Sequence, residues 1–222
     1  MKIVLHSICF FISIVFSTSS FAQKIMNEGT LTYGISIESA NEEKKMINAL
    51  NGAILTLYIT KDKSRTEIVN TLGTQATFFD AKIGKGYLLR EYSAQKLMIT
   101  VNADNWAQKN KVNNNLSFKI EDGTITIGGY TCKKATATAA DGKNYTVYFD
   151  PSVTLANKTY NNAFPQLQGL PVQYELQSGN LTFKYTLSKN SADVVAINKF
   201  ETPKAGYRIM TFEENQQLKK GE

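Results

Sequence analysis

Apolar and polar residues alternate along most of the chain, which is the period of a β-strand with one buried and one solvent-facing side. The clearest examples are TLTYGISIE (residues 30–38) and LTFKYTLS (residues 181–188). The same alternation predicts further short strands at 53–60, 65–70, 76–80, 86–92, 96–102, 116–121, 124–132, 144–149, 172–177 and 194–198. We therefore predict a mainly β fold with a single large curved antiparallel sheet of the half-barrel kind.

Helices are scarce in the pattern, and we expect one or two of them to cover the sheet. Residues 41–50, NEEKKMINAL, begin with a capping asparagine and space Met46, Ile47 and Leu50 on one face. A second short helix is predicted around Trp106, where the indole is expected to be a packing anchor. The acidic pair Glu213-Glu214, followed by two lysines, indicates a short C-terminal helix or tail.

Turn-forming residues separate the predicted strands. Glu121-Asp122-Gly123, Asp141-Gly142 and Ser178-Gly179-Asn180 read as hairpin turns. Residues 151–171 have no clear strand pattern and are long for a connection within a compact domain. Their apolar residues predict a loop that folds back onto the sheet: Leu155, Phe164, Leu167 and Leu170.

The first 22 residues have the features of a signal peptide. Lys2 is followed by an apolar run that is too short for a membrane span, and Ser20-Phe21-Ala22 provides small residues at the expected cleavage site. No cysteine stands directly after the apolar run, so no lipid anchor is expected. We predict one exported domain over residues 23–222, periplasmic or secreted to the cell surface, without a transmembrane segment.

Cleavage after Ala22 has a chemical consequence. It removes the only histidine, His6, and one of the two cysteines, Cys9. Without an imidazole, the mature chain excludes Ser-His-Asp and Cys-His nucleophilic sites and His-rich zinc sites. A single thiol also cannot form an internal disulfide, so the fold depends on its apolar core. We expect neither a cofactor nor a metal.

Enzymatic function would have to rest on carboxylates. The candidates have neither metal-ligand spacing nor a glycosidase signature: Asp80, Glu91, Asp141 and Asp150. We therefore expect that the protein is not an enzyme.

The charge is positive but scattered. The chain has 25 basic and 19 acidic residues, a formal net charge of +6. Nucleic-acid binding concentrates lysine and arginine on one stripe, and no such stripe is evident here. We expect a mixed, solvated surface and no nucleic-acid partner; weak attraction to anionic lipid headgroups is the alternative.

The segment TIGGYTCKKA contains two adjacent glycines and the cysteine that remains after export. The apolar positions are odd before Gly128-Gly129 and even after them, which predicts a β-bulge at the glycines. Cys132 is then a small buried apolar residue. The alternative is a thiol activated by Lys133 or Lys134, but alternation turns Lys133 away, and no partner histidine or resolving cysteine exists.

Four ordered blocks carry a resemblance to a known family: TIGGYTCKKA, DGKNYTVYFD, FPQLQGLPVQYEL and PKAGYRIMTFEE. They resemble the GLPGLI family of exported bacterial proteins, mostly of unknown function, and a related domain-of-unknown-function family. The second glycine of the family signature is absent here, where the chain reads GLPVQYE. The residues that match the family blocks are Gly128, Gly129, Tyr130, Cys132, Gly142, Gly169, Leu170, Pro171 and Glu175.

The resemblance implies an exported β-rich domain without an established enzyme activity. The matching residues read as structural, with glycines for turns, Pro171 at a strand entry and Glu175 on the wet face. By strand count and helix content alone, such families are also similar to the lipoprotein-carrier (LolA-like) half-barrel, in which a curved sheet and helices enclose an apolar cavity. Fold by itself does not determine function.

Two functional hypotheses follow. The first is a binding or carrier module for an apolar ligand such as a lipid acyl chain, held inside the curved sheet. The second is a structural or protein-interaction component of the cell envelope or surface, which would use strand edges or the 151–171 loop. A carrier requires a cavity for its ligand, and a purely structural protein does not.

Overall fold

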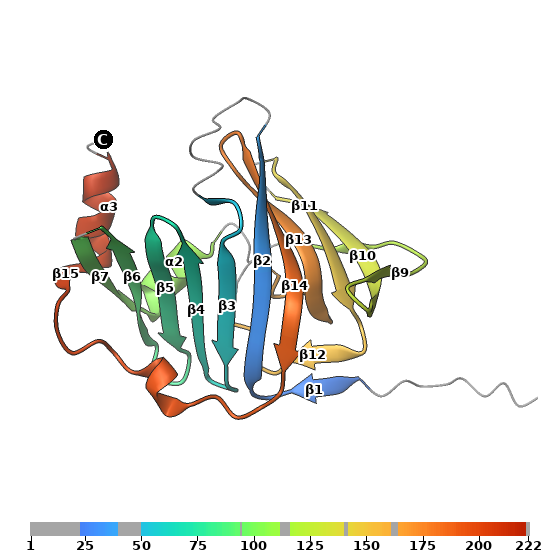
Figure 1. The fold of residues 1–222 in the computed structure, drawn as a ribbon, viewed down its shortest axis with the longest axis horizontal. Coiled ribbons are helices and arrows are strands. Elements are labelled where there is room, and N and C mark those ends of the chain that lie inside the picture. Colours follow the sequence, from blue (N-terminus) through green and yellow to red (C-terminus); the bar gives the residue numbers. More distant parts are fainter. Residues whose placement is uncertain are drawn as a thin grey trace, which may run out of the picture.

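One large open sheet dominates the fold of this protein. The structure is a computed structural model, and it describes residues 23–39, 50–93, 95–111, 116–139, 142–160 and 164–220. The strands are β1 (Lys24–Met26), β2 (Gly29–Ser39), β3 (Ile54–Ile59), β4 (Lys63–Asn70), β5 (Gly73–Asp80), β6 (Lys85–Tyr92), β7 (Gln95–Asn102), β8 (Lys119–Ile120), β9 (Ile125–Ile127), β10 (Tyr130–Thr138), β11 (Asn144–Asp150), β12 (Val153–Leu155), β13 (Leu170–Ser178), β14 (Leu181–Ser191) and β15 (Arg208–Thr211). Within the described residues, thirteen of them form one sheet in the order β15-β7-β6-β5-β4-β3-β2-β14-β13-β11-β10-β8, and β9 also pairs with β10. The predicted curved half-barrel sheet is confirmed (Figure 1).

The sheet joins two runs of antiparallel strands at its centre. Strands β2 to β7 follow one another as a meander, and β14, β13, β11 and β10 extend the sheet from the other side of β2. Strand β15 adds to β7 in parallel, and β1 pairs in parallel with β12 as a separate two-stranded ribbon. The β2–β14 pairing therefore holds an early and a late part of the chain together.

Strand alternation gives the sheet two faces with different covers. On the inner face, one row of successive cross-strand partners is Val147, Tyr174, Tyr185 and Ile35. A second row is Leu31, Leu57, Thr66, Thr77, Leu88 and Ile99. The outer face of β5, β6 and β7 carries Ala76, Phe78, Tyr87, Leu89 and Met98, all of them buried. These three strands are therefore apolar on both faces.

The inner face is covered by a short helix and by the segment before β13. Helix α2 (Ala103–Lys109) begins at Asn102, whose side chain accepts a hydrogen bond from the backbone N–H of Asn105. Trp106 stacks on Phe79, with ring centroids 4.4 Å apart, and Figure 1 shows the helix behind the sheet. Further along the chain, Phe164 packs edge-on against Tyr174. The predicted packing role of Trp106 is confirmed.

Residues 192–207, here called the strap, cover the outer face. The strap contains the short 3₁₀ helix η1 (Ile197–Phe200) and leads from β14 to β15 (Figure 1). Val195 and Phe200 are buried against the outer-face residues of β5 to β7, whereas Val194 and Ile197 are exposed. The predicted strand at 194–198 is therefore wrong, because its apolar residues pack over a sheet face and do not pair with a strand.

The chain ends in a helix, as the acidic and basic residues there predict. Helix α3 (Phe212–Lys220) starts at Thr211, whose hydroxyl accepts a hydrogen bond from the backbone N–H of Glu214. The Glu214 carboxylate accepts in return from the Thr211 N–H, which completes a reciprocal cap. The helix predicted at 41–50 lies outside the described residues except for Leu50.

Gly128 and Gly129 form a hairpin turn, so the predicted bulge is wrong. Tyr130 pairs with Ile127, and Cys132 pairs with Ile125, in the antiparallel β9–β10 ribbon. Both glycines have positive φ, 56° and 86°, as a two-residue turn of the type I′ class requires. Such a turn pairs odd positions before it with even positions after it, which produces the same parity change as a bulge.

Two further turn predictions need correction. Glu121-Asp122-Gly123 is not a hairpin, because β8 and β9 both pair with β10 and the three residues only interrupt that edge of the sheet. Residues 151–171 contain strand β12, which pairs with β1, and they include the start of β13. The hairpin at Ser178-Gly179-Asn180 is confirmed by the pairing of Ser178 with Leu181.

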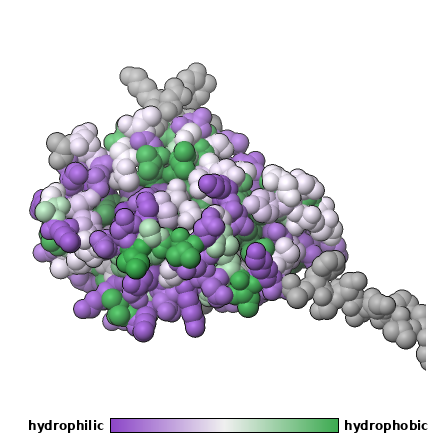
Figure 2. Space-filling model, turned by 60° about the horizontal axis from the view of Figure 1, so that its bottom comes forward, coloured by the Kyte–Doolittle hydropathy of each residue, from purple (hydrophilic) through white to green (hydrophobic). Residues whose placement is uncertain are grey.

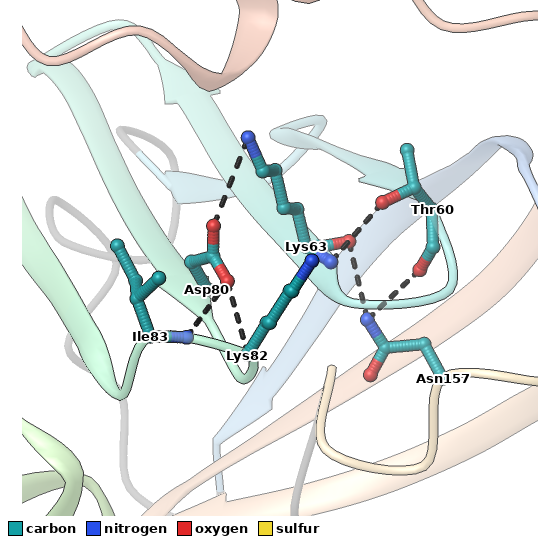
Figure 3. A network of polar contacts seen from close by, with 6 residues as sticks. All are labelled: Thr60, Lys63, Asp80, Lys82, Ile83 and Asn157. Atoms are coloured by element: carbon teal, nitrogen blue, oxygen red, sulfur yellow. Dashed lines mark hydrogen bonds and ion pairs between the residues drawn. The ribbon is translucent and has the colours of Figure 1, made fainter.

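A buried amide holds the segment after β12 against the sheet. Asn157 donates from Nδ2 to the backbone carbonyl oxygens of Thr60 and Lys63, at 3.0 and 3.1 Å, in the turn between β3 and β4 (Figure 3). Its Oδ1 accepts from the backbone and side chain of Thr159. These hydrogen bonds join the connection to the β3–β4 turn, so it folds back onto the sheet as its sequence predicts.

Gly169 lies at the entry to β13, where close packing leaves no room for a side chain. A Cβ atom there would lie 2.1 Å from Phe149 Cδ2 and 2.9 Å from the carbonyl oxygen of Asp150. We expect Gly169→Ala to lower the free energy of unfolding by about 2–3 kcal/mol in urea denaturation, because buried Phe149 would have to move. Gly179→Ala is the control: its φ is +58° with open space around it, so only about 1 kcal/mol is expected. Equal losses in the two variants would contradict the packing argument.

Candidate functional site

A cavity lies at the outer face, beside the strap. It has a volume of about 510 Å³ and is bounded by the ends of β5 to β7, the strap and the start of α3. Here it is called the outer pocket. Its lining residues are Phe78, Ile83, Lys85, Gly86, Tyr87, Met98, Thr100, Val101, Asn102, Asn105, Thr202, Thr211 and Glu213.

The floor of the outer pocket is apolar and held in place by aromatic packing. Phe78 and Tyr87 are cross-strand partners whose rings stack at 5.0 Å, and Met98 is buried in the same cluster. The Tyr87 hydroxyl donates to the carbonyl oxygen of Glu201 in the strap at 2.7 Å and accepts from Arg65 Nη1 at 3.1 Å. Burial raises the pKa of Tyr87 despite the guanidinium, so the hydroxyl remains a donor. The tyrosine thus fixes the strap over the floor.

The wall of the outer pocket is polar and joins the two helices. Asn105 is buried, donates from Nδ2 to Glu213 Oε1 at 2.7 Å, and accepts from the backbone N–H of Asn102 through Oδ1. Hydrogen bonds from its own backbone N–H and from Asn105 lower the pKa of Glu213. The wall therefore carries an ionised carboxylate whose position is set by α2.

One basic side chain lies at the rim of the outer pocket. Lys85 begins β6 and is exposed. Its ammonium has no ion-pair or hydrogen-bond partner in the described part of the chain. The rim can therefore bind an anionic group without breaking an existing pair.

A second, smaller cavity lies on the inner face beneath α2 and has a volume of about 140 Å³. Here it is called the inner cavity. Its lining residues are Leu55, Thr66, Thr77, Trp106, Lys109, Asn110, Tyr160, Tyr174, Leu176 and Tyr185. None of these residues belongs to the outer pocket.

Tyrosines make up much of the inner cavity. Tyr174 and Tyr185 stack at 4.7 Å and 11°, and Tyr33 packs edge-on against Tyr174 while donating to the carbonyl oxygen of Pro171 at 2.8 Å. Burial raises the pKa of Tyr160 and raises that of Tyr185 to about 12. Burial, with smaller effects of neighbouring tyrosines, also raises the pKa of Tyr33 and Tyr174. Besides these hydroxyls and ring faces, the inner cavity is lined by Lys109, whose ammonium lies 5.2 Å from the centre of the Trp106 ring.

Cys132 is fully buried, as predicted, and is not activated. Burial, followed by the charge of Asp150, raises its pKa to about 11. Lys134 lines the same small surface cavity, of about 270 Å³, but its ammonium is paired with Glu121 at 2.9 Å. The geometry favours a structural thiol over a reactive one.

The other residues that match the family blocks are spread along the β10–β14 half of the sheet and do not converge on a cavity. Gly142 has a φ of 82° in the β10–β11 turn, and Gly169 permits the contact with Phe149. Leu170 and Pro171 are buried at the start of β13, and Glu175 is exposed between Tyr174 and Leu176, as predicted. Tyr130 is half-buried beside the Gly128-Gly129 turn.

The carboxylates considered for catalysis are engaged separately. Asp80 accepts from the backbone N–H groups of Lys82 and Ile83 through Oδ1, and its Oδ2 lies 3.7 Å from Lys63 Nζ (Figure 3). Glu91 binds the hydroxyl of Tyr207 and the ammonium of Lys96. Asp150 accepts from Ser152, and Asp141 lies outside the described residues.

The sequence interpretation missed the outer pocket. Its lining residues come from separate strands, the strap and the start of α3, and of them only Thr211 and Glu213 fall within a quoted family block, PKAGYRIMTFEE. The available signal was the adjacent pair Phe78-Phe79, which breaks alternation and indicates a strand buried on both faces. Such a strand requires a cover on each face of the sheet. The outer pocket lies at the margin of the outer cover, the strap.

The described residues contain neither a metal-binding cluster nor a membrane-spanning helix. No group of three or more histidine, cysteine, aspartate or glutamate side chains is placed to hold a metal ion there. Among the same residues, no helix is both long enough and apolar enough to cross a membrane.

Comparison with known proteins supports the fold. An uncharacterized conserved protein from Thermus thermophilus aligns over 82% of this chain and 90% of its own, with a TM-score of 0.50 and 8% identity. PNGF-II aligns over 87% of this chain but 34% of its own, with a TM-score of 0.45 and 15% identity. A chain of the Pseudomonas aeruginosa MucA/MucB complex aligns over 78% of this chain and 56% of its own, with a TM-score of 0.40 and 9% identity. The last two likenesses are too distant to inform function.

No protein-family model matches the chain. No curated protein matches it either. The resemblance to the GLPGLI family therefore stays a prediction.

The tyrosines of the inner face predict alkaline unfolding. A folded pKa above the unfolded value of about 10 means that the native state keeps protons that the unfolded chain loses. Their contribution to stability is therefore complete below pH 10 and is lost as the pH rises toward the folded values. We expect a constant urea midpoint from pH 7 to 9 and a steep fall above pH 10, which becomes shallower in Tyr185→Phe. Tyrosine ionisation at 295 nm without loss of circular dichroism would contradict this expectation.

The thiol of Cys132 provides a second test. With a pKa of about 11, roughly one thiol in a thousand is ionised at pH 8. We expect alkylation by iodoacetamide at pH 8 to be at least about a hundredfold slower in the native protein than in urea. The rate should be unchanged in Lys134→Gln, because that ammonium is bound to Glu121. Rapid native alkylation that slows in Lys134→Gln would support an activated thiol instead.

Proposed function

We propose that this protein is an exported binding module for an amphipathic, mainly apolar ligand, and that the ligand lies in the outer pocket. The observation that carries the proposal is the combination of an apolar floor, Phe78, Tyr87 and Met98, with a polar wall and a volume of about 510 Å³. Ligand sites are typically clefts of about 300–1,000 Å³ with a few fixed polar groups. The proposal contains no catalytic step.

Cavity volume favours the outer pocket over the inner face. The carrier hypothesis expected an acyl chain inside the curved sheet, among its inward aromatics. The inner cavity measures about 140 Å³, well below the usual range for such ligands. Phe164, Leu167 and Leu116 are buried over that face and fill much of its core. We therefore assign the chain-like ligand to the outer face.

The rim indicates which polar group the ligand carries. Lys85 provides an ammonium without a partner in the described part of the chain. The ionised Glu213 lines the polar wall of the same pocket and would repel a second negative charge. A ligand with a single carboxylate beside Lys85 and an apolar body over the floor would pair with the ammonium and place no second negative charge beside Glu213. Medium-chain fatty acids have this chemistry.

The alternative, a protein-interaction module that adds a strand at its edge, is less favoured by the geometry. The β8–β9 edge exposes Ile120 and Ile125, but residues 121–124 interrupt it and the Glu121–Lys134 ion pair lies beside the gap. Interruptions and charges are common protections against strand addition. On the face shown in Figure 2, apolar residues are scattered among hydrophilic ones and form no large patch.

Decanoic acid tests the outer pocket by isothermal titration calorimetry. We expect Thr202→Trp to weaken binding at least tenfold, because the indole would project from the strap into the pocket. Lys204→Trp, two residues further along the same strap, is the matched control and should bind normally. Lys85→Gln should weaken binding about two- to fivefold at low salt, whereas Lys82→Gln should not.

Native mass spectrometry and organic extraction test whether a ligand is bound when residues 23–222 are purified without detergent. A stoichiometric amphipathic acid, lost in Thr202→Trp and kept in Lys204→Trp, is the expected result. A clean protein mass, together with no calorimetric response to fatty acids of eight to sixteen carbons, would overturn the proposal and favour an envelope partner.

A further inference from the structure

The outer pocket carries one positive and one negative side chain that do not pair with each other. Among the described residues that line it, only Lys85 and Glu213 are charged. No ion pair joins either of them to another side chain in the part of the chain that the structure describes. An ammonium and a carboxylate in one pocket are therefore open to two opposite charges of a guest.

Two asparagines connect these charges along one margin of the outer pocket. Lys85 and Asn102 are cross-strand partners on β6 and β7. Asn102 and Asn105 exchange hydrogen bonds at the start of α2, and Asn105 Nδ2 donates to Glu213 Oε1 at 2.7 Å. The polar margin is therefore continuous from the ammonium to the carboxylate, and it shares no residue with the apolar floor.

We propose that the ligand of the outer pocket has a zwitterionic head, which carries both a carboxylate and an ammonium group, and an apolar tail. The carboxylate pairs with Lys85, the ammonium pairs with Glu213, and the tail covers the floor. This inference rests on the proposed function, because it adds an ammonium group to the acidic ligand of that pocket. Apolar α-amino acids are the simplest molecules of this class.

The electrostatics of Glu213 favour an ammonium over a neutral group. Hydrogen bonds from its own backbone N–H and from Asn105 lower its pKa, so the side chain is a carboxylate at neutral pH. A carboxylate only accepts hydrogen bonds, and a cationic donor forms the stronger, charge-assisted bond. A fatty acid alone would leave this carboxylate without a cation.

The division of the pocket into a polar margin and an apolar floor determines where the ammonium is placed on the ligand. Lys85 and Glu213 both belong to the margin, so the acid and the ammonium belong to the same end of the guest. An ammonium at the far end of the tail would lie over the floor, where its removal from water is unfavourable. The α and ω positions of the ligand are thus expected to differ.

Isothermal titration calorimetry with decanoic acid and its substituted forms tests this inference at neutral pH and low salt. We expect α-aminodecanoic acid to bind about two- to fivefold more tightly than decanoic acid, the range of one exposed ion pair. The neutral donor of α-hydroxydecanoic acid should give a smaller gain, and ω-aminodecanoic acid should show none. The gain should decrease at high salt, because mobile ions screen exposed charges.

Glu213→Gln tests the carboxylate itself. Glutamine can still accept the hydrogen bond from Asn105, so the wall should stay in place while the charge is lost. The preference for α-aminodecanoic acid should disappear, whereas decanoic acid should bind at least as well as to the native protein, which shows that the pocket is intact. Glu214→Gln is the matched control, because it removes the same charge one residue further along α3, outside the pocket lining. The preference should remain in this control.

The possible outcomes separate this inference from the proposed function. Binding of decanoic acid without a gain from the α-ammonium, or a gain that persists in Glu213→Gln, would overturn the inference and leave the pocket as a fatty-acid site. An equal gain from the α-hydroxyl or from the ω-ammonium would also overturn the zwitterionic head. No binding of any of these acids would overturn the proposed function as well.

Discussion

Successive side chains on a β-strand point to opposite faces, and in β5 this places Phe78 and Phe79 on different sides of the same sheet. Each ring must be removed from water by a different part of the chain. Phe79 is covered by Trp106 of α2, and Phe78 by Phe200 of the strap. The three strands β5 to β7 therefore form the middle layer of a three-layer arrangement. The need to bury one ring on each face explains why α2 lies on the inner face and the strap on the outer face.

Specific polar contacts fix the covers where apolar packing alone would allow them to slide. Tyr87 donates to the carbonyl of Glu201 in the strap, and Asn157 donates to two carbonyls in the β3–β4 turn. Tyr33 donates to the carbonyl of Pro171 at the start of β13. Each contact ties a side chain to a defined backbone carbonyl across the boundary of cover and sheet, so the register of cover and sheet is specified.

Both cavities arise where a cover meets the sheet. The outer pocket lies between the strap, α3 and the margin of β5 to β7, where the apolar floor meets the Asn105–Glu213 wall. The inner cavity lies between α2 and the central tyrosines, where flat rings leave space between them. The two cavities differ in size, about 510 Å³ for the outer pocket and about 140 Å³ for the inner cavity.

The amino-acid sequence by itself determined the class of fold, because period-two alternation is a local property of each strand. It also predicted the buried thiol of Cys132, the packing of Trp106 and the hairpin at Gly179. It did not distinguish a bulge from a hairpin at Gly128-Gly129, since both shift the parity of the following strand. Only the tertiary structure decided which face the strap covers and where the cavities lie. Lys85 is far in the chain from Thr202 and Glu213, and it meets them only because strand pairing and two opposing covers bring all three to one margin of the sheet.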